Sequence, residues 1–115
     1  MCATNPQDNN PETPVLIGAL LEKGNPMDFF DGLVDEIRLW SVARSQNELR
    51  SAMHLALSGS EDGLAGYWPL DECAGQRAHD RRGAHDALLH GGTWVHSPIQ
   101  FANYKDRFGC IDVLC

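Results

Sequence analysis

The sequence predicts a single, mostly β domain with one short α-helix. Three stretches, residues 15–21, 33–40 and 64–70, have the length and the apolar or alternating pattern of strands. Segments rich in Gly, Pro, Asn and Asp separate them, as turns do. Only one stretch, after residue 45, has helical spacing. A chain of 115 residues is long enough for one domain.

The first half of the chain divides into a lead-in, a strand, a turn and a second strand. Residues 1–13 are polar and rich in Pro and Asn, which predicts a flexible N-terminal segment. Residues 22–28 contain Gly24, Asn25 and Pro26 and predict a turn. On the strand 33–40, alternation places Asp35 on one face with Leu33, Ile37 and Leu39, and places the others on the opposite face. Those others are Val34, Glu36, Arg38 and Trp40.

A capping box predicts where the helix begins. Ser45 and Glu48 have the S-x-x-E spacing in which each side chain bonds the other residue's backbone N–H. An apolar stripe follows, and we expect it to pack on the sheet, with Gly59 ending the helix. The stripe consists of Leu49, Ala52, Met53, Ala56 and Leu57.

The second half is predicted to contain shorter elements. In the strand 64–70, Leu64, Trp68 and Leu70 share one face, and Pro69 places that end of the strand at an edge or bulge. Residues 75–83 read as a polar loop, and residues 86–89 and 93–95 as two short strands.

Two motifs carry a resemblance to a known family. The stretch FDGLVDEIRLW (residues 30–40) resembles the last strand of the laminin G-like, pentraxin-like branch of the concanavalin A-like lectin/glucanase jelly rolls. The stretch that begins GYWPLDE (residues 66–95) resembles the family's opening, so the ending motif precedes the opening motif here. The family's long middle has no counterpart, and the resemblance covers residues 14–99. Residues 100–115 form a C-terminal tail outside it.

The resemblance implies a partial jelly roll, an antiparallel half sandwich in which the two motif strands run side by side. One sheet face would then lack its cover, so we expect a homodimer or higher oligomer. The function implied is a non-catalytic binding module that recognises a glycan or a protein. The alternative is a self-associating structural half-domain with no small-molecule ligand. Relatives are often extracellular, although the chain shows neither a signal peptide nor a membrane span, so its localisation stays open.

Three carboxylates are candidate metal ligands. Asp35 lies in an apolar register, Glu72 continues the register of Leu64, Trp68 and Leu70, and Asp80 sits in a D-x-x-G turn. In relatives, acidic groups at these places often bind a structural Ca²⁺, which prefers oxygen ligands. The alternative is that the carboxylates accept hydrogen bonds from turn amides, or pair with arginines in place of an ion.

Trp40 and Tyr67 are the candidate ligand-binding residues. Both lie off the face that carries Trp68, so we expect them to be an exposed pair on which a sugar could stack. Core packing is the competing interpretation for aromatic residues on strands.

Composition narrows the function further. The net charge of −7 argues against nucleic acid and anionic membranes as partners. The sequence contains no nucleophile elbow, no phosphate-binding loop and no recognisable pair of catalytic residues, so we do not expect an enzyme. The four cysteines form no C-x-x-C pair and are expected to be free thiols, unless Cys110 and Cys115 bond to each other or a disulfide joins two chains.

Overall fold

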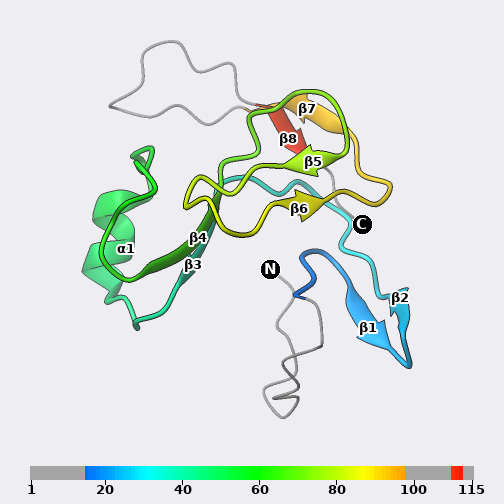
Figure 1. Ribbon diagram of the computed structural model, residues 1–115, viewed down its shortest axis with the longest axis horizontal. Helices are drawn as coiled ribbons and strands as arrows, with labels where there is room; N and C mark the ends of the chain where they lie inside the picture. Colours follow the sequence, from blue (N-terminus) through cyan, green and yellow to red (C-terminus); the bar gives the residue numbers. More distant parts are fainter. Residues whose placement is uncertain (1–14, 98–109, 113–115) are drawn as a thin grey trace.

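A computed structural model describes residues 15–97 and the backbone of residues 110–112. The described chain is mostly β, with a single short helix, as the sequence predicts. The predicted lead-in, residues 1–13, and the predicted tail, apart from the backbone of residues 110–112, lie outside the described residues. The elements are β1 (Leu20–Glu22), β2 (Asn25–Met27), β3 (Ile37–Trp40), α1 (Gln46–Ala52), β4 (Leu64–Trp68), β5 (Arg77–Ala78), β6 (Ala87–Leu88), β7 (Trp94–His96) and β8 (Cys110–Asp112) (Figure 1).

The strands form four separate two-stranded antiparallel sheets within the described residues, rather than one continuous half sandwich. The pairs are β1–β2, β3–β4, β5–β6 and β7–β8. The β1–β2 hairpin and α1 lie at opposite ends of the long axis (Figure 1). In the hairpin, Lys23 and Gly24 both have positive φ, the geometry of a tight two-residue loop.

The β3–β4 pair joins the two motifs on which the family resemblance rests. These strands run antiparallel, with Arg38 opposite Tyr67 and Leu39 opposite Gly66, so the predicted adjacency of the two motifs is confirmed. The register shifts between Leu39 and Trp40, where Trp40 faces Leu64. This irregularity moves Leu64 onto the face of Tyr67, whereas simple alternation had placed it with Trp68.

Two apolar clusters lie on either side of the β3–β4 pair. Trp68, Leu70, Ala78 and Leu89 form one, and Leu57, Leu64 and Tyr67 form the other, against which Trp40 packs. Val34 and Ile37 both pack on the first cluster, although alternation predicts opposite faces for them. The cause is Glu36, whose φ of 53° interrupts the extended backbone before β3 begins.

The helix begins where the sequence predicts and ends earlier. Ser45 is the N-cap, and the capping box with Glu48 is present. The helix ends at Ala52, so its predicted end at Gly59 is wrong. None of its residues is buried, and Leu49 and Met53 are 51% and 54% exposed, so the expectation that the stripe packs on the chain's own sheet is wrong for these two residues. Leu57, beyond the end of the helix, is buried in the second cluster. Within the described part of the chain, no helix has the length and apolar character needed to cross a membrane.

Candidate functional site

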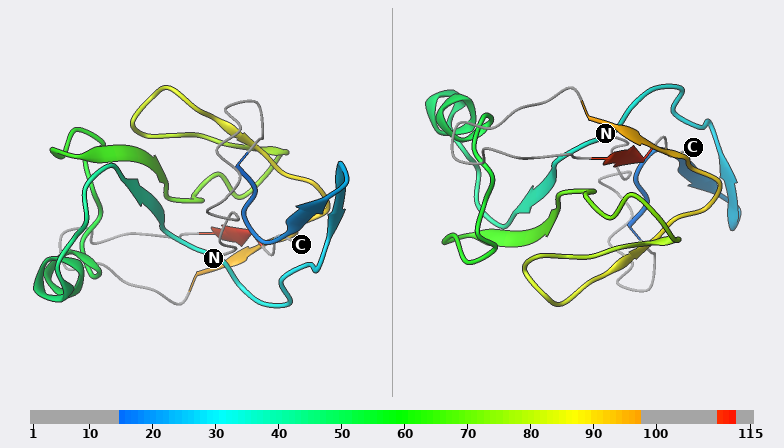
Figure 2. Two further views of the ribbon diagram at one scale, coloured as in Figure 1. Left: turned by 90° about the horizontal axis from the view of Figure 1, so that it is seen from below. Right: turned by 90° about the horizontal axis from the view of Figure 1, so that it is seen from above.

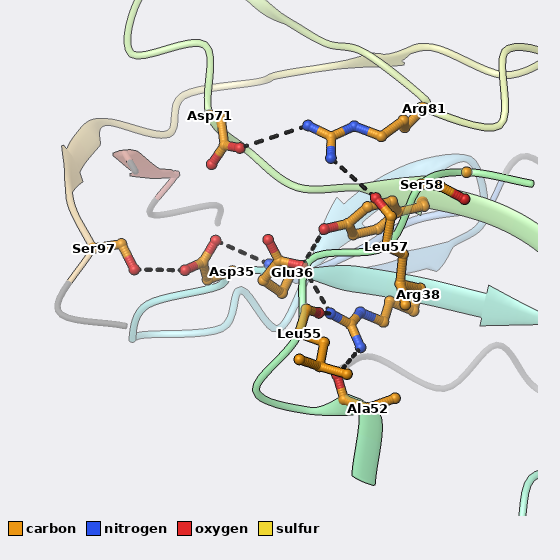
Figure 3. Close-up of polar contacts among 12 residues, drawn as sticks. Asp35, Glu36, Arg38, Ala52, Leu55, Leu57, Ser58, Asp71, Arg81 and Ser97 are labelled. Atoms are coloured by element: carbon orange, nitrogen blue, oxygen red, sulfur yellow. Dashed lines mark hydrogen bonds and ion pairs between the residues drawn. The ribbon is translucent and has the colours of Figure 1, made fainter. Parts of the chain in front are cut away.

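A polar network connects the start of β3 with β4. Glu36 lies immediately before β3, and its Oε2 accepts a hydrogen bond from the hydroxyl of Tyr67 in β4 (Figure 3). The same oxygen lies 3.2 Å from Nη2 of Arg38. Tyr67 is fully buried, and the Glu36 and Arg38 side chains are only 11% and 12% exposed. The ion pair is therefore shielded from water. Because of this shielding, the attraction between its two charges is stronger than in a surface pair.

Arg38 also holds the end of α1. Its guanidinium donates hydrogen bonds to the carbonyl oxygens of Ala52 and Leu55, which lie in and just after the last helical turn. The last carbonyl groups of a helix have no partner within the helix. A cationic side chain placed there donates hydrogen bonds to them and interacts favourably with the negative end of the helix dipole. The guanidinium carbon lies 5.4 Å from the centroid of the Tyr67 ring. One side chain thus links β3, β4 and α1.

Arg81 extends the network to the segment that follows Asp80. Its guanidinium carbon is 5.3 Å from the Tyr67 ring, and Nη1 donates a 3.1 Å hydrogen bond to the carbonyl oxygen of Leu57. Nη2 lies 3.9 Å from Oδ2 of Asp71 (Figure 3). Arg81 is the more exposed of the two arginines, so its pair with Asp71 contributes less than the pair of Arg38 with Glu36.

The environment of Tyr67 keeps its phenol protonated. Burial raises the pKa of Tyr67 well above its usual value, and the hydrogen bond to Glu36 and the charge of Glu36 raise it further. A phenol held neutral in this way acts as a hydrogen-bond donor and does not act as a base at ordinary pH. The geometry therefore indicates that the network has a structural role: it holds β3, β4 and α1 together.

Asp80 is the most deeply buried acid of the described residues. It is 0% exposed, and its carboxylate accepts hydrogen bonds from the backbone N–H groups of Tyr67 (2.9 Å), Arg82 (2.9 Å) and His85 (3.1 Å). Burial raises the pKa of Asp80, but these N–H donors outweigh burial and the net pKa is lowered. The carboxylate is charged and locks the turn against β4.

The carboxylates predicted to share a calcium ion are engaged elsewhere. Asp35 accepts hydrogen bonds from the N–H of Glu36 (2.9 Å) and the hydroxyl of Ser97 (2.6 Å), and Glu72 accepts one from the N–H of His79 (2.8 Å). Both oxygens of Asp80 face N–H donors, which is the opposite of the arrangement a cation requires. No group of three or more acidic, His or Cys side chains within the described residues could hold a metal ion. In this arrangement the three carboxylates do not fit a calcium ion, and the predicted calcium site is untested.

The predicted contrast between a buried Asp35 and an exposed Glu36 is wrong for Glu36. Alternation turns Asp35 toward the apolar side and Glu36 toward solvent. In the structure Glu36 is nearly buried against Tyr67, and Asp35 is half-buried beside Ser97. The positive φ of Glu36 removes the regular pleat on which the alternation argument depends.

The predicted aromatic pair is not exposed. Tyr67 is fully buried, and Trp40 is partly buried against the cluster that contains it. The Trp40 ring also lies 4.2 Å from the guanidinium carbon of Arg44. The expectation of an exposed stacking pair is therefore wrong, because Tyr67 packs with Leu57 and Leu64 and Trp40 packs against this cluster.

A groove runs beside β3, and we call it the β3 groove. Its volume is about 640 Å³, and residues 34–38 line it together with Ile17, Phe30, Leu33, Trp40, Gln46, Leu49, Arg50 and Met53. Its apolar side chains come from the segments before β3, from β3 itself, and from α1 with its C-cap Met53. Phe30 is 41% exposed, Leu33 56%, Leu49 51% and Met53 54%. The sequence signal for this surface was the Met-bearing helical stripe, which was expected to be covered.

Two further features correct or extend the sequence analysis. Cys73 is disulfide-bonded, so the expectation of free thiols is wrong for this cysteine, and its partner lies outside the described side chains. The network of Glu36, Arg38 and Arg81 was not predicted as a site. The opposite charges of Glu36 and Arg38, two residues apart on a predicted strand, were the available signal.

Scans against protein-family models, curated proteins and solved structures gave no significant match to this chain.

Proposed function

We propose that the chain is a non-catalytic protein-interaction module of the concanavalin A-like type that associates with a second copy of itself. The observation that carries this proposal is the exposed apolar lining of the β3 groove, above all Leu33, Leu49 and Met53, each more than half exposed. A contiguous apolar patch on a small domain is typical of a surface that another protein covers. The helix supports the same conclusion because it buries none of its residues within its own chain.

Charge favours a second copy as the occupant of this surface. The chain as a whole carries a net charge of −7, so two copies repel each other over most of their surfaces. The lining of the β3 groove holds two acidic residues, Asp35 and Glu36, and two basic residues, Arg38 and Arg50. The groove is therefore locally neutral, and two copies can meet there without local repulsion.

The resemblance implies that the two motif strands are neighbours, and β3 and β4 pair antiparallel. Glycan recognition is the other function that the resemblance implies. It has less support, because Tyr67 is in the interior and Trp40 is left without an exposed aromatic partner. A protein surface is the better match to a groove lined by leucine, methionine and phenylalanine.

Size-exclusion chromatography with light scattering tests the proposal over micromolar to submillimolar concentrations. We expect a dimer whose population rises with concentration, and a non-reducing gel excludes a covalent one. The double variant Leu49→Ser/Met53→Ser should weaken the dimer, whereas Val42→Ser, at a 52% exposed position outside the groove lining, should not. A wild-type chain that stays monomeric throughout overturns self-association. Sugar binding by that monomer on a glycan array would support the glycan module instead.

A further inference from the structure

The β3–β4 sheet has one closed edge and one open edge in the described part of the chain. At β4, the N–H of Tyr67 donates to Asp80 and its carbonyl oxygen accepts from the N–H of Arg81 at 2.7 Å. Both backbone groups of Tyr67 therefore point away from β3. The segment at Asp80 and Arg81 closes that edge, and no further strand can pair there.

This arrangement fixes which groups of β3 point outward. In an antiparallel pair, opposite residues alternate between bonded and non-bonded pairs. Tyr67 is opposite Arg38, so this is a non-bonded pair, and the backbone N–H and C=O of Arg38 face away from β4. Ser41 donates its N–H to Gly63 on the β4 side, so by alternation Trp40 also faces outward. Within residues 15–97, these outward groups have no hydrogen-bond partner.

The β3 groove lies between β3 and α1. Three of the four β3 residues, Ile37, Arg38 and Trp40, line it. Gln46, Leu49 and Arg50 of α1 line its other side. Seen from below and from above, β3 lies between β4 and the side of the molecule that holds α1 (Figure 2). The exposed side chains of Leu49 and Met53 thus flank the open edge.

We propose that β3 pairs through this edge with β3 of a second copy, antiparallel and about a two-fold axis at Leu39. This inference rests on the proposed self-association and specifies its interface. The backbone N–H and C=O of Arg38 in each copy then form hydrogen bonds with the backbone C=O and N–H of Trp40 in the other copy. Every outward N–H and C=O group of these two residues thereby gains a partner in both copies. Two short two-stranded sheets become one four-stranded sheet, which is more stable than an isolated hairpin.

The side chains select this register over its neighbours. Leu39 is 48% exposed, and at the two-fold axis it meets Leu39 of the second copy as a closely spaced pair. A register centred on Arg38 would place two guanidinium groups directly opposite each other, which is unfavourable. A register shifted toward Glu36 would require pairing at a residue with positive φ, where the strand has not yet begun.

Residue-resolved amide hydrogen exchange tests the interface on the full chain. We expect the amides of Arg38 and Trp40 to become protected by about tenfold or more as the dimer population rises with concentration. The amide of Tyr67, already bonded to Asp80, should not change. Leu39→Lys should abolish both the dimer and this protection, because charge on an open strand opposes pairing. Leu88→Lys, at a 60% exposed position in β6, is the matched control and should leave the dimer intact.

The outcomes separate this interface from self-association itself. A dimer that survives Leu39→Lys and leaves Arg38 and Trp40 unprotected would overturn the edge pairing, and self-association would stand. Protection that does not depend on concentration would show that the same chain covers its own edge, which also overturns the edge pairing. A wild-type chain that is monomeric at every concentration would overturn both proposals.

Discussion

The hydroxyl of Tyr67 donates a hydrogen bond to Glu36, a residue 31 positions earlier in the chain, and this contact joins β4 to the residue just before β3. The bond is possible because Glu36 has a φ of 53°, which directs its side chain toward the buried ring. Arg38 then balances the charge of Glu36 and carries the connection to α1. The stability of the β3–β4 pair is thus tied to one strained residue.

Glu36→Ala should destabilise the fold by about 2 kcal/mol, because the Tyr67 hydroxyl and the Arg38 guanidinium lose a charged acceptor. Asp35→Ala should have the smaller effect, about 1 kcal/mol, because Asp35 is only half-buried. Urea unfolding midpoints of the two variants measure the difference. A larger loss for Asp35→Ala would restore the alternation argument.

Glu36→Gly separates the hydrogen bonds from the backbone strain. It loses the same side-chain contacts as Glu36→Ala but accepts a positive φ without steric cost, so it should be about 1 kcal/mol more stable than the alanine variant. Equal unfolding free energies for Glu36→Gly and Glu36→Ala would show that the backbone at this residue is not strained.

Tyr67 should stay protonated at alkaline pH as long as the chain is folded. Its pKa is raised by burial and by Glu36, so its contribution to stability is complete below pH about 10 and is lost as the pH rises through the raised value. In a Tyr104→Phe background, Tyr67 is the only tyrosine, and its ionisation can be followed by ultraviolet absorbance. Tyrosinate should form only together with the unfolding seen by circular dichroism. Ionisation near pH 10 in a folded chain would contradict the buried hydrogen bond.

Asp80 should make the chain sensitive to acid. Its lowered pKa gives stability that is complete above pH about 4 and is lost as the pH falls through the lowered value. Asp80→Asn should cost about 3 kcal/mol at neutral pH, because the amide places donors against donors. It should also flatten the acid limb of the stability curve, whereas Asp62→Asn at an exposed position should not. An unchanged acid limb in Asp80→Asn would assign acid unfolding to other groups.

Two glycines with positive φ provide a matched pair. At Gly59 a methyl group would lie 2.5 Å from the carbonyl oxygen of Arg81, whereas at Gly75 it would meet nothing within 4 Å. Gly75→Ala should cost only the backbone strain, about 1 kcal/mol. Gly59→Ala should cost about 1–3 kcal/mol more, because backbone must move. Equal melting temperatures for the two variants would contradict the close approach of Gly59 to Arg81.

Calcium binding by Asp35, Glu72 and Asp80 is tested by melting curves in millimolar calcium and in EDTA. Since their oxygens accept hydrogen bonds from N–H and hydroxyl donors, we expect equal melting temperatures in the two conditions. A rise in calcium that magnesium does not reproduce would show that the carboxylates rearrange around an ion.

Local signals in the sequence predicted local structure well. The spacing of Ser45 and Glu48 gave the start of α1, because a capping box involves only neighbouring residues. The resemblance gave the pairing of β3 with β4. The end of the helix was not predictable, because it depends on Arg38, whose side chain reaches carbonyls 14 and 17 residues away.

The candidate site was predicted only in part, for a related reason. Period-two alternation places side chains correctly when every residue is extended, and neither the φ of Glu36 nor the register shift at Trp40 leaves a mark in the residue pattern. The first irregularity turns the Glu36 side chain toward the interior, and the second brings Leu64 onto the face of Tyr67. The turn at Asp80 was recognised, but its N–H donors come partly from β4, and only the folded chain brings them together.

The segment between α1 and β4 has a consequence for the order of folding. Its carbonyl oxygens at Leu55, Leu57 and Gly59 accept hydrogen bonds from the side chains of Arg38, Arg81 and Arg82. These donors lie 17 to 24 residues away, on both sides of the segment in sequence. The closure entropy of both loops opposes these contacts until β3 and β4 have paired and the Asp80 turn has closed. We therefore expect this segment to fold late, after β3 and β4 have paired.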